Sequence, residues 1–302
     1  MPLVNTKEMF LNANKNHYAV GSFNCDTLDM AQAVLTQSNH LNSPVIVAFS
    51  EGSREFMHPG NIKELLNIVT KDIKIPYAIH LDHGKNFDIC KACIDEGFTS
   101  VMIDTGDVSY SESIRLTKEV VEYAHKFNVC VEGELGELEI NKEEYKGFTD
   151  PYLAIRFIKE TGIDSLAISI GTKHGTNKNI NDFRWDILKI INEELGLFPL
   201  VLHGSSSIPS TLIDEFNKYG GNIHNTKGIN EELLIKAAQF NVAKINIATD
   251  FRLTYVTNLR KTLSLINDHY EPRRYLVPTH NELMKLVEHK LTKVLLSSNK
   301  IG

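Results

Sequence analysis

Three histidine–glycine pairs are the residues of this chain whose types and spacing most clearly indicate metal chemistry. His83-Gly84 closes the segment Ile79-His-Leu-Asp-His-Gly84, and His174-Gly175 and His203-Gly204 follow much later in the chain. Each pair comes just after an apolar, β-branched run that predicts a buried strand. Three imidazoles around one ion, with an open coordination position, are typical of a catalytic zinc-type site. A polar pocket without metal is the alternative interpretation.

Two further polar residues precede His83 in the same predicted strand. Asp82 would face away from His83 if the strand is regular, and there it would orient a ligand or act as a general base. His80 shares the face of Asp82 two residues earlier, deeper in the fold. We therefore expect His80 to support the site rather than to bind metal.

Eight short apolar runs of this kind alternate with amphipathic segments along the chain. They are nearly continuous in apolar character, as expected for parallel strands that are buried on both faces. The predicted strands are 19–24, 44–50, 77–82, 100–106, 129–136, 165–171, 199–204 and 244–250.

Eight strands that alternate with helices predict a closed parallel (β/α)8 TIM barrel that spans residues 1–302 as a single domain. An open doubly wound sheet is the competing fold. It would more often carry a glycine-rich turn after its first strand, but Gly21-Ser-Phe-Asn24 lacks the G-x-G-x-x-G pattern.

Several helices are predicted between and after these strands. They include Ile114–Phe127, a helix opened by Thr149-Asp-Pro151, another opened by Pro209-Ser210, then Glu231–Phe240 and finally Asn281–Leu296. A polar, glycine-rich insertion at residues 218–230 precedes the helix at Glu231.

The predicted strands are apolar at their start and polar at their finish. In this barrel the active site lies at the carboxyl ends of the strands, so we expect these polar side chains to meet at one mouth. They are Asp82-His83, Asp104, Glu134, His174, His203 and Thr249-Asp250.

A short serine-rich loop, His203-Gly-Ser-Ser-Ser-Ile-Pro209, precedes a predicted helix. Backbone N–H groups at such a helix start suit a phosphate group, and the loops after strands 7 and 8 are a common phosphate site in these barrels. Lys178 could reach the same anion. The alternatives are an ordinary helix cap and a solvated lysine.

Composition excludes several classes of function. The 302 residues are 42% apolar and 23% charged with a net charge of −6, so a nucleic-acid partner is not expected. The sequence shows neither an apolar signal segment nor a membrane-spanning stretch. Four cysteines, irregularly placed, suggest a reduced, cytoplasmic protein. Cys90 and Cys93 share one face of a predicted helix, which favours core packing over a redox or zinc pair.

Taken in order, these motifs resemble the class II, metal-dependent ketose-bisphosphate aldolases, which include the fructose-1,6-bisphosphate and tagatose-1,6-bisphosphate aldolases. The resemblance covers nearly the whole chain. The segments that carry it are Tyr18-Ala-Val-Gly-Ser-Phe-Asn24, Asn42-Ser-Pro-Val45, His80-Leu-Asp-His-Gly84, Gly97-Phe-Thr-Ser-Val-Met-Ile-Asp104, Val131-Glu-Gly-Glu-Leu-Gly136, Ile170-Gly-Thr-Lys-His-Gly175, Leu200-Val-Leu-His-Gly204, Lys244-Ile-Asn-Ile247 and Glu271-Pro-Arg-Arg-Tyr275.

The resemblance implies that His83, His174 and His203 hold a catalytic Zn²⁺ and that Asp82 is the general acid/base. Asp104 and Glu134 match acidic positions near the metal, which some relatives use for alternate metal positions or for structure. The positions that match the C1-phosphate and dihydroxyacetone end are Gly175, Lys178, Gly204, Ser205, Ser206, Ser207, Asn246 and Thr249. The candidates for the distal phosphate are Ser50, Arg252 and Arg273, with one arginine contributed by a neighbouring subunit. Homodimers or homotetramers are usual in the family, and relatives suggest a monovalent cation.

The chain departs from the family pattern at two places. Relatives usually continue Glu-Leu-Gly with a glycine pair and a loop glutamate for the second proton transfer, whereas here the loop after Gly136 lacks the pair. Glu143 or Glu144, or else Glu139, is the candidate acid. Ala248 stands where fructose-bisphosphate members often carry aspartate, which is closer to tagatose-type members, while the glycine insertion and serine loop are closer to fructose-type members. The sugar therefore stays open.

Three hypotheses follow. The first is a zinc-dependent aldolase that cleaves a ketose 1,6-bisphosphate into dihydroxyacetone phosphate and glyceraldehyde 3-phosphate. The second keeps the metal site and changes the substrate, for example to a keto-sugar-acid phosphate. The third is a non-catalytic barrel that binds sugar phosphate as a sensor or scaffold.

Overall fold

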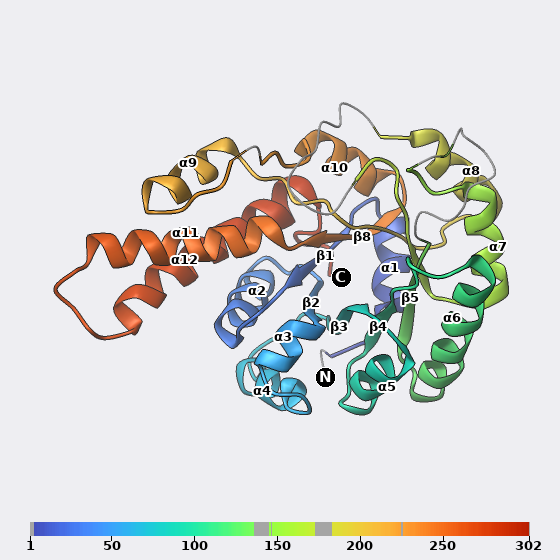
Figure 1. Cartoon of the computed structure of the whole chain (residues 1–302), viewed down its shortest axis with the longest axis horizontal. Coiled ribbons are helices and arrows are strands. Elements are labelled where there is room, and N and C mark those ends of the chain that lie inside the picture. The colour runs from blue at the N-terminus through green and yellow to red at the C-terminus, as the bar shows by residue number, and fades with distance from the viewer. Residues whose placement is uncertain (1–2, 136–144, 146, 173–182, 225, 302) are drawn as a thin grey trace.

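The computed structural model describes residues 3–135, 145, 147–172, 183–224 and 226–301. Within these ranges, eight parallel strands close into a barrel in sequence order, with helices around it (Figure 1). The TIM-barrel prediction is confirmed over the open sheet. The strands are β1 (Val20–Asn24), β2 (Val45–Ser50), β3 (Tyr77–Gly84), β4 (Ser100–Ile103), β5 (Cys130–Glu134), β6 (Ser165–Ala167), β7 (Leu200–Leu202) and β8 (Val242–Ile247).

The barrel closes where β1 pairs with both β2 and β8. Ser22 lies opposite Ile46 on one side and opposite Asn246 on the other. Each of these strands is buried along almost its whole length, which explains their nearly continuous apolar sequence.

Helices cover the outside of the barrel. They are α1 (Thr6–Lys15), α2 (Leu28–His40), α3 (Glu51–Phe56), α4 (Ile62–Val69), α5 (Phe87–Asp95), α6 (Tyr110–Ala124), α7 (Pro151–Thr161), α8 (Trp185–Leu195), α9 (Ser210–Lys218), α10 (Glu231–Gln239), α11 (Thr249–Leu265) and α12 (Arg273–His289), with a 3-10 turn η1 (His125–Phe127) and a π-helical turn η3 (Lys290–Val294).

Local capping residues explain where several helices begin. Asp150 accepts hydrogen bonds from the backbone N–H groups of Tyr152 and Leu153, and Pro151 is the first residue of α7, as predicted. The helix expected at Ile114–Phe127 begins earlier, at Tyr110, because Ser109 caps it. Its last three residues form η1.

The C-terminal helix was predicted too short at its start. We expected Asn281–Leu296, but α12 begins at Arg273, passes through Pro278 and gives way to η3 after His289. A proline normally marks a helix boundary because it cannot donate a backbone hydrogen bond. Here α12 packs along α11 and α2, and this tertiary packing keeps the helix continuous.

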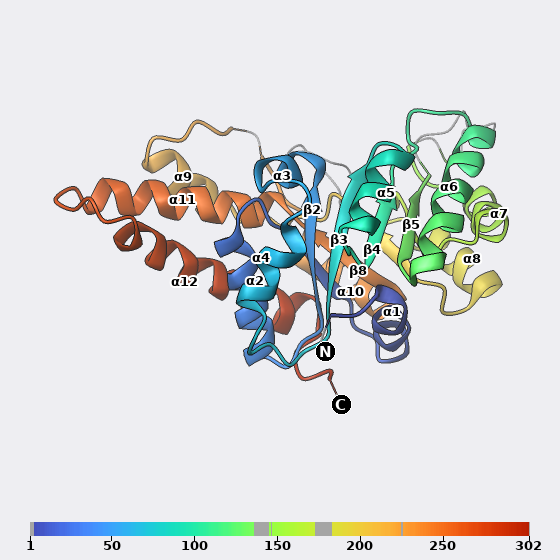
Figure 2. The ribbon, with the colours of Figure 1, turned by 90° about the horizontal axis from the view of Figure 1, so that it is seen from below.

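The amino end of the barrel is apolar. Helix α1 lies under it (Figure 2), and its Met9, Phe10 and Ala13 pack with residues at the starts of the strands. Apolar side chains thus fill this end of the barrel.

Helices α11 and α12 form an antiparallel pair that extends away from the barrel, with α9 beside α11 (Figures 1 and 2). Helix α11 starts at the carboxyl mouth, directly after β8. The pair therefore connects the site to a surface well outside the barrel, and we refer to α11 and α12 together as the arm.

The four cysteines are buried and unpaired with one another. Cys90 and Cys93 lie in α5 and pack in the main core, which confirms the core-packing prediction. In the part of the chain that the structure describes, no helix is both long enough and apolar enough to cross a membrane.

Candidate metal centre and active site

An irregularity in β3 brings Asp82 and His83 to the same site. The pairing of β3 with β4 shifts register between Leu81 and Gly84, and His83 has a φ of 54°, in the left-handed region. Such a conformation is uncommon outside glycine and clusters at functional sites. The sequence led us to place Asp82 opposite His83 in a regular strand, but the strand is not regular. The ligand atoms of Asp82, His83 and His203 all lie within 4.8 Å of one another.

Close packing explains why a glycine, Gly84, follows this bulge. A Cβ atom at this position would lie 2.8 Å from the backbone oxygen of Met102 and 2.9 Å from the Sγ atom of Cys90. The glycine of this His-Gly pair is therefore required by close packing of β3 against β4 and α5.

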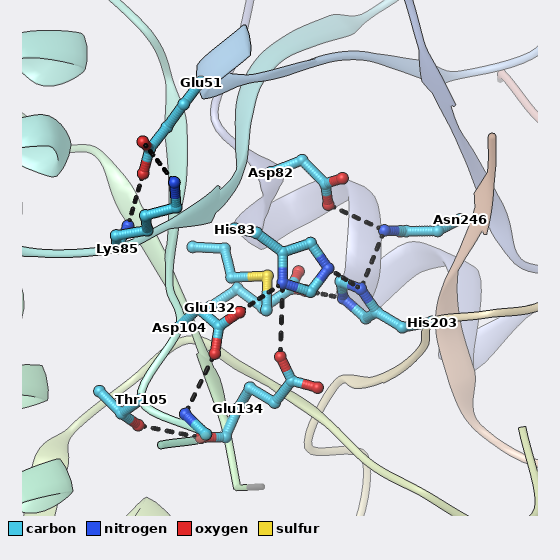
Figure 3. Close-up of polar contacts among 12 residues, drawn as sticks. Glu51, Asp82, His83, Lys85, Asp104, Thr105, Glu132, Glu134, His203 and Asn246 are labelled. Carbon is cyan, nitrogen blue, oxygen red and sulfur yellow. Dashed lines mark hydrogen bonds and ion pairs between the residues drawn. The ribbon is translucent and has the colours of Figure 1, made fainter. Parts of the chain in front are cut away.

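Two of the three predicted histidine ligands, His83 and His203, lie in the described residues, and their ring nitrogens face each other (Figure 3). Nδ1 of His203 lies 3.1 Å from Nε2 of His83. On its other side, His83 Nδ1 lies 2.8 Å from Asp104 Oδ2 and 3.6 Å from Glu134 Oε2. Because a carboxylate only accepts hydrogen bonds, His83 donates from Nδ1, and its Nε2 faces His203.

His203 is oriented by a buried carboxylate. Its Nε2 donates to Glu132 Oε1 at 2.8 Å, which leaves the Nδ1 lone pair on the side of His83. Glu132 is 1% exposed and is held in turn by Lys244, whose Nζ lies 2.8 Å from Glu132 Oε2. His83 Nε2, His203 Nδ1 and the amide Nδ2 of Asn246, which lies 3.2 Å from His203 Nδ1, therefore meet at one point, where a cation would find two ring nitrogens.

Lys244 also donates to Nε2 of His80 at 3.0 Å, and His80 Nδ1 then donates to Ser100 at 2.9 Å. Burial and the Lys244 charge lower the pKa of His80 to about 3, so this ring is neutral. The expectation that His80 supports the site from below agrees with this position. The interior polar network thus runs from Ser100 through His80, Lys244 and Glu132 to His203.

Asp82 is held by two amides. Asn24 donates to its Oδ2 at 2.7 Å, and Asn246 donates to its Oδ1 at 3.0 Å. Burial alone would raise the pKa of Asp82, but His203 and His83 hold it well below its usual range. Asp82 is consequently an ionised, oriented carboxylate beside the histidine pair.

The acidic residues around His83 favour a positive charge on its ring or on a cation bound beside it. Burial alone would lower the pKa of His83, but the hydrogen bond to Asp104 and the charges of Asp82 and Glu134 raise it to about 9. Hydrogen bonding to His83 lowers the pKa of Asp104, whereas burial raises that of Glu134. His83, Asp104 and Glu134 form a second group that could hold a cation.

This donor set fits a divalent metal. Two imidazole nitrogens and a carboxylate converge, and each imidazole is oriented by a carboxylate on its other nitrogen, as in known metal sites. His83 and His203, with Asp82 beside them, are the described residues that could hold the ion. His174, the third predicted ligand, lies outside the described residues.

A cavity of about 260 Å³ opens over this cluster at the carboxyl end of the barrel. Its lining combines the acid–histidine cluster with the serine loop and the start of α11. The lining residues are Asn24, Ser50, Asp82, His83, Gly204, Ser205, Ser206, Asn246, Ala248, Thr249 and Arg252. A larger cavity of about 950 Å³ lies at the amino end, lined by Tyr18, Pro44 and Pro76 among others, remote from these groups.

The serine loop is tied to the start of α11 rather than to α9. Ser206 Oγ accepts a hydrogen bond from the backbone N–H of Thr249, and Ser206 and Thr249 both line the cavity. Ser207 turns away from the cavity, where its Oγ donates to Glu231 at 2.7 Å and also contacts Lys290. The helix start that lines the cavity is therefore that of α11, whereas the start of the helix opened by Pro209 is not part of the lining.

The remaining predicted site residues fall into three groups. Ser50 and Arg252 line the cavity beside Asp82. Arg273 does not, because it begins α12 at the far end of the arm and pairs there with Glu271 at 2.7 Å. Gly175, Lys178, Glu143 and Glu144 lie outside the described residues, as does His174.

Sequence reasoning missed three polar residues of the site, namely Asn24, Glu132 and Lys244. A signal for two of them was present, since Glu132 lies within the predicted strand 129–136 and Lys244 begins the predicted strand 244–250, so both charges were expected near the buried interior. A buried charge needs a partner, so the pair could have been inferred.

A closed (β/α)8 barrel with converging imidazoles and carboxylates at its carboxyl mouth defines a metal-dependent barrel enzyme. The model of one family, fructose-bisphosphate aldolase class-II, matches residues 4–300. The chain belongs to this class II aldolase family, a metal-dependent family of carbon–carbon lyases. The hypothesis of a non-catalytic barrel is set aside by this membership.

Relatives and solved structures agree with this assignment. The fructose-bisphosphate aldolase of Treponema pallidum is 38% identical over 323 aligned positions, which cover 99% of this chain and 97% of the relative. That of Giardia intestinalis is 37% identical, with 96% and 92% covered. The crystal structure of the YdjI aldolase from Escherichia coli K12 superposes with a TM-score of 0.81 at 25% identity, covering 99% of this chain and 100% of that one.

Proposed function

We propose that this chain is a Zn²⁺-dependent aldolase that reversibly cleaves a ketose 1,6-bisphosphate, fructose or tagatose 1,6-bisphosphate, into dihydroxyacetone phosphate and glyceraldehyde 3-phosphate. The observation that carries the proposal is the convergence of His83 Nε2 and His203 Nδ1 beside the ionised Asp82. His174 would complete the ligand set. When bound, the metal would supply Lewis-acid stabilisation of the negative charge that develops on the substrate carbonyl oxygen.

Asp82 is suited to take the proton of the C4 hydroxyl. As it does so, the C4 oxygen becomes a carbonyl, the C3–C4 bond breaks, and its electron pair moves onto the C2 carbonyl to give an enediolate. Glyceraldehyde 3-phosphate leaves, and a second acid then protonates C3 to give dihydroxyacetone phosphate. Glu143 or Glu144 is the proposed second acid, and a Schiff-base lysine is not required.

The amides that hold Asp82 are suited to orient the substrate as well. Oδ1 of Asn24 and Oδ1 of Asn246 are buried and have no hydrogen-bond partner among the residues described. Both residues line the cavity, so these acceptors are available to substrate hydroxyls. Gly204, Ser205, Ser206 and Thr249 would bind the C1 phosphate, together with Gly175 and Lys178 from the predicted set. Ser207, whose hydroxyl contacts Glu231, would hold the loop in place instead of binding the phosphate.

The distal phosphate would be bound by Ser50 and Arg252. Arg273 would contribute from a neighbouring subunit of a homodimer or homotetramer. The end of the arm is suited to such an assembly, because Leu265, Tyr270 and Val277 are between 57% and 93% exposed there. A single barrel domain, a cytoplasmic location and an assisting monovalent cation belong to the same proposal.

A substrate with a different distal end is the second candidate. Ala248 lines the cavity where fructose-type members often carry a carboxylate, and the YdjI aldolase shares the fold over its full length. A keto-sugar or sugar-acid phosphate would use the same metal cluster and serine loop.

Steady-state cleavage assays test the proposal. Purified protein with added Zn²⁺ is expected to cleave at least one of the two bisphosphate epimers, and EDTA is expected to abolish cleavage. Borohydride added with substrate is expected to leave activity intact, since a Schiff base does not form. Full activity after complete metal removal would contradict the proposal, and activity only on a sugar-acid phosphate would favour the second candidate.

A further inference from the structure

Arg252 is held by a carboxylate at the edge of the cavity. Its Nε donates to Asp26 Oδ2 at 2.7 Å and its Nη2 to Asp26 Oδ1 at 2.9 Å. Ser53 donates to the same Oδ1 at 2.6 Å. Asp26 follows β1, Ser53 lies in α3 and Arg252 in α11, so three separate elements build this contact.

This contact neutralises the charge that an anionic substrate end would meet. Arg252 is the one lysine or arginine among the described residues that line the cavity. Burial alone would raise the pKa of Asp26, but hydrogen bonds from Arg252 and Ser53 lower it, so Asp26 is ionised at neutral pH. Asp82 lines the same cavity and adds a further negative charge near Arg252.

The geometry also restricts how a second anion can approach. A guanidinium binds carboxylate or phosphate best through two parallel N–H donors on one edge. Asp26 takes the edge formed by Nε and Nη2, so a distal phosphate has to bind from the Nη1 side or displace Asp26. In either case, a dianion lies close to the Asp26 carboxylate, which is electrostatically unfavourable.

An apolar pocket adjoins the same arginine. It has a volume of about 530 Å³, shares Ser50 and Arg252 with the catalytic cavity, and is walled by Met30, Phe56 and Tyr255. An uncharged distal group therefore has apolar surface to contact beside Arg252.

We infer that Asp26 is a specificity-determining residue, which shares Arg252 with the distal end of the substrate and so weakens the preference for a phosphorylated over an unphosphorylated end. The inference rests on the proposed function, because it concerns the aldehyde half of the same substrate. Ser53 strengthens the effect by holding the Asp26 carboxylate in place.

The test compares two aldehydes in the direction of condensation. The full-length, zinc-loaded protein is assayed with dihydroxyacetone phosphate and either D-glyceraldehyde 3-phosphate or D-glyceraldehyde. Asp26→Asn is expected to raise the ratio of the two kcat/KM values about tenfold, mainly through a lower KM for the phosphorylated aldehyde. Ser53→Ala is expected to change the ratio in the same direction by about twofold.

Asp29→Asn is the matched control. It removes one negative charge from the same segment, where Asp29 bonds to Thr27 rather than to Arg252. Its ratio is expected to equal that of the wild type. A ratio that falls in Asp26→Asn would show that Asp26 instead prepares Arg252 for phosphate, and an unchanged ratio would remove Asp26 from specificity altogether; both outcomes overturn the inference.

Binding without turnover separates this inference from the proposed function. Calorimetry with sn-glycerol 3-phosphate and with glycerol compares the same two ends without any reaction. Asp26→Asn is expected to bind sn-glycerol 3-phosphate about tenfold more tightly than the wild type. If the wild type condensed neither aldehyde, the proposed function would fail, whereas the binding comparison would still decide the role of Asp26.

Discussion

The proposed site has a metal half, around Asp82, Glu132 and His203, and an anion half, around Arg252 and Asp26, and the two halves are held in different ways. In the metal half, Asp82, Glu132 and His203 are at most 7% exposed, and each makes two hydrogen bonds to other buried groups. In the anion half, the Arg252 and Asp26 side chains are 40% and 37% exposed and depend mainly on each other.

Because of this difference, we expect the metal half to set the reaction rate and the anion half to set the affinity for the substrate. Buried, fully bonded groups have one arrangement, and removal of one partner leaves another group unsatisfied at a large cost. A half-exposed ion pair is weakened by solvent and can exchange partners. We therefore expect substitutions in the metal half to change rates or metal binding by orders of magnitude, and those in the anion half to change affinity and stability modestly.

The largest effect is expected for Asp82→Asn in the metal half. The variant keeps the size of the side chain but removes the base, so kcat for cleavage should fall by about 10²- to 10⁴-fold. Exchange of the C3 proton of dihydroxyacetone phosphate with solvent should persist, because that step uses the second acid. Rapid-quench kinetics and NMR measure the two steps, and zinc content is checked in the same samples.

Equal losses in cleavage and in proton exchange would contradict the role of Asp82 as the base for the C4 hydroxyl proton. They would show that the carboxylate is needed for binding metal or substrate rather than for the C4 hydroxyl proton. His83→Ala is the comparison variant, since loss of a ligand is expected to remove both activities together with the zinc.

A smaller effect is expected from Glu132→Gln, which acts through His203. Without the carboxylate, the His203 tautomer and ring orientation are less strongly fixed, so zinc affinity should fall by about 10- to 100-fold. Lys244 would also lose its counter-charge, which costs about 3–5 kcal/mol in comparable buried pairs. Competition with a chelator of known affinity measures zinc binding, and thermal unfolding measures stability.

The double variant Glu132→Gln with Lys244→Met sharpens the comparison between orientation and stability. It removes the unpaired charge, so stability should recover in part while zinc affinity stays low. Recovery of zinc affinity together with stability would mean that Glu132 supports the fold and does not orient His203.

The fold and much of the metal half could be predicted because their sequence signals are local. Eight apolar runs with polar ends specify a barrel and its mouth, and His83 and His203 meet there as expected. Boundaries that depend on tertiary packing were less predictable. The helix predicted at Asn281–Leu296 begins eight residues earlier, at Arg273, and continues through Pro278 where it packs along α11 and α2.

The parts that could not be predicted arise from irregular backbone or from contacts between distant elements. The left-handed φ of His83 places Asp82 and His83 in one site, contrary to the alternation of a regular strand. The pairing of Asp26 with Arg252 joins residues 226 positions apart, and neither residue has a motif that indicates the other. Such contacts depend on the closed barrel, which places β1 beside β8.

The smallest effect is expected for substitution of Glu231, which contacts Ser207 of the serine loop. Glu231 accepts hydrogen bonds from Ser207 at 2.7 Å, His289 at 2.8 Å and Lys290 at 3.0 Å. Burial alone would raise the pKa of Glu231, but Lys290 and these hydrogen bonds lower it to about 2. Because the pKa is lower in the folded state, Glu231 stabilises the protein above its ordinary pKa near 4.5, and this contribution is lost as pH falls through about 2.

Glu231→Gln should therefore lower the melting temperature at pH 7 by about 2 °C, with a difference from wild type that shrinks progressively below pH 4.5. The KM for the bisphosphate should rise by no more than about threefold, because the Ser207 hydroxyl contacts Glu231 rather than the cavity. Glu232→Gln is the matched control, an exposed glutamate in the same first turn of α10, and is expected to leave the melting temperature unchanged. A pH-independent difference, or a loss of activity as large as that of Asp82→Asn, would show that the serine loop is as rigidly coupled to catalysis as the metal half.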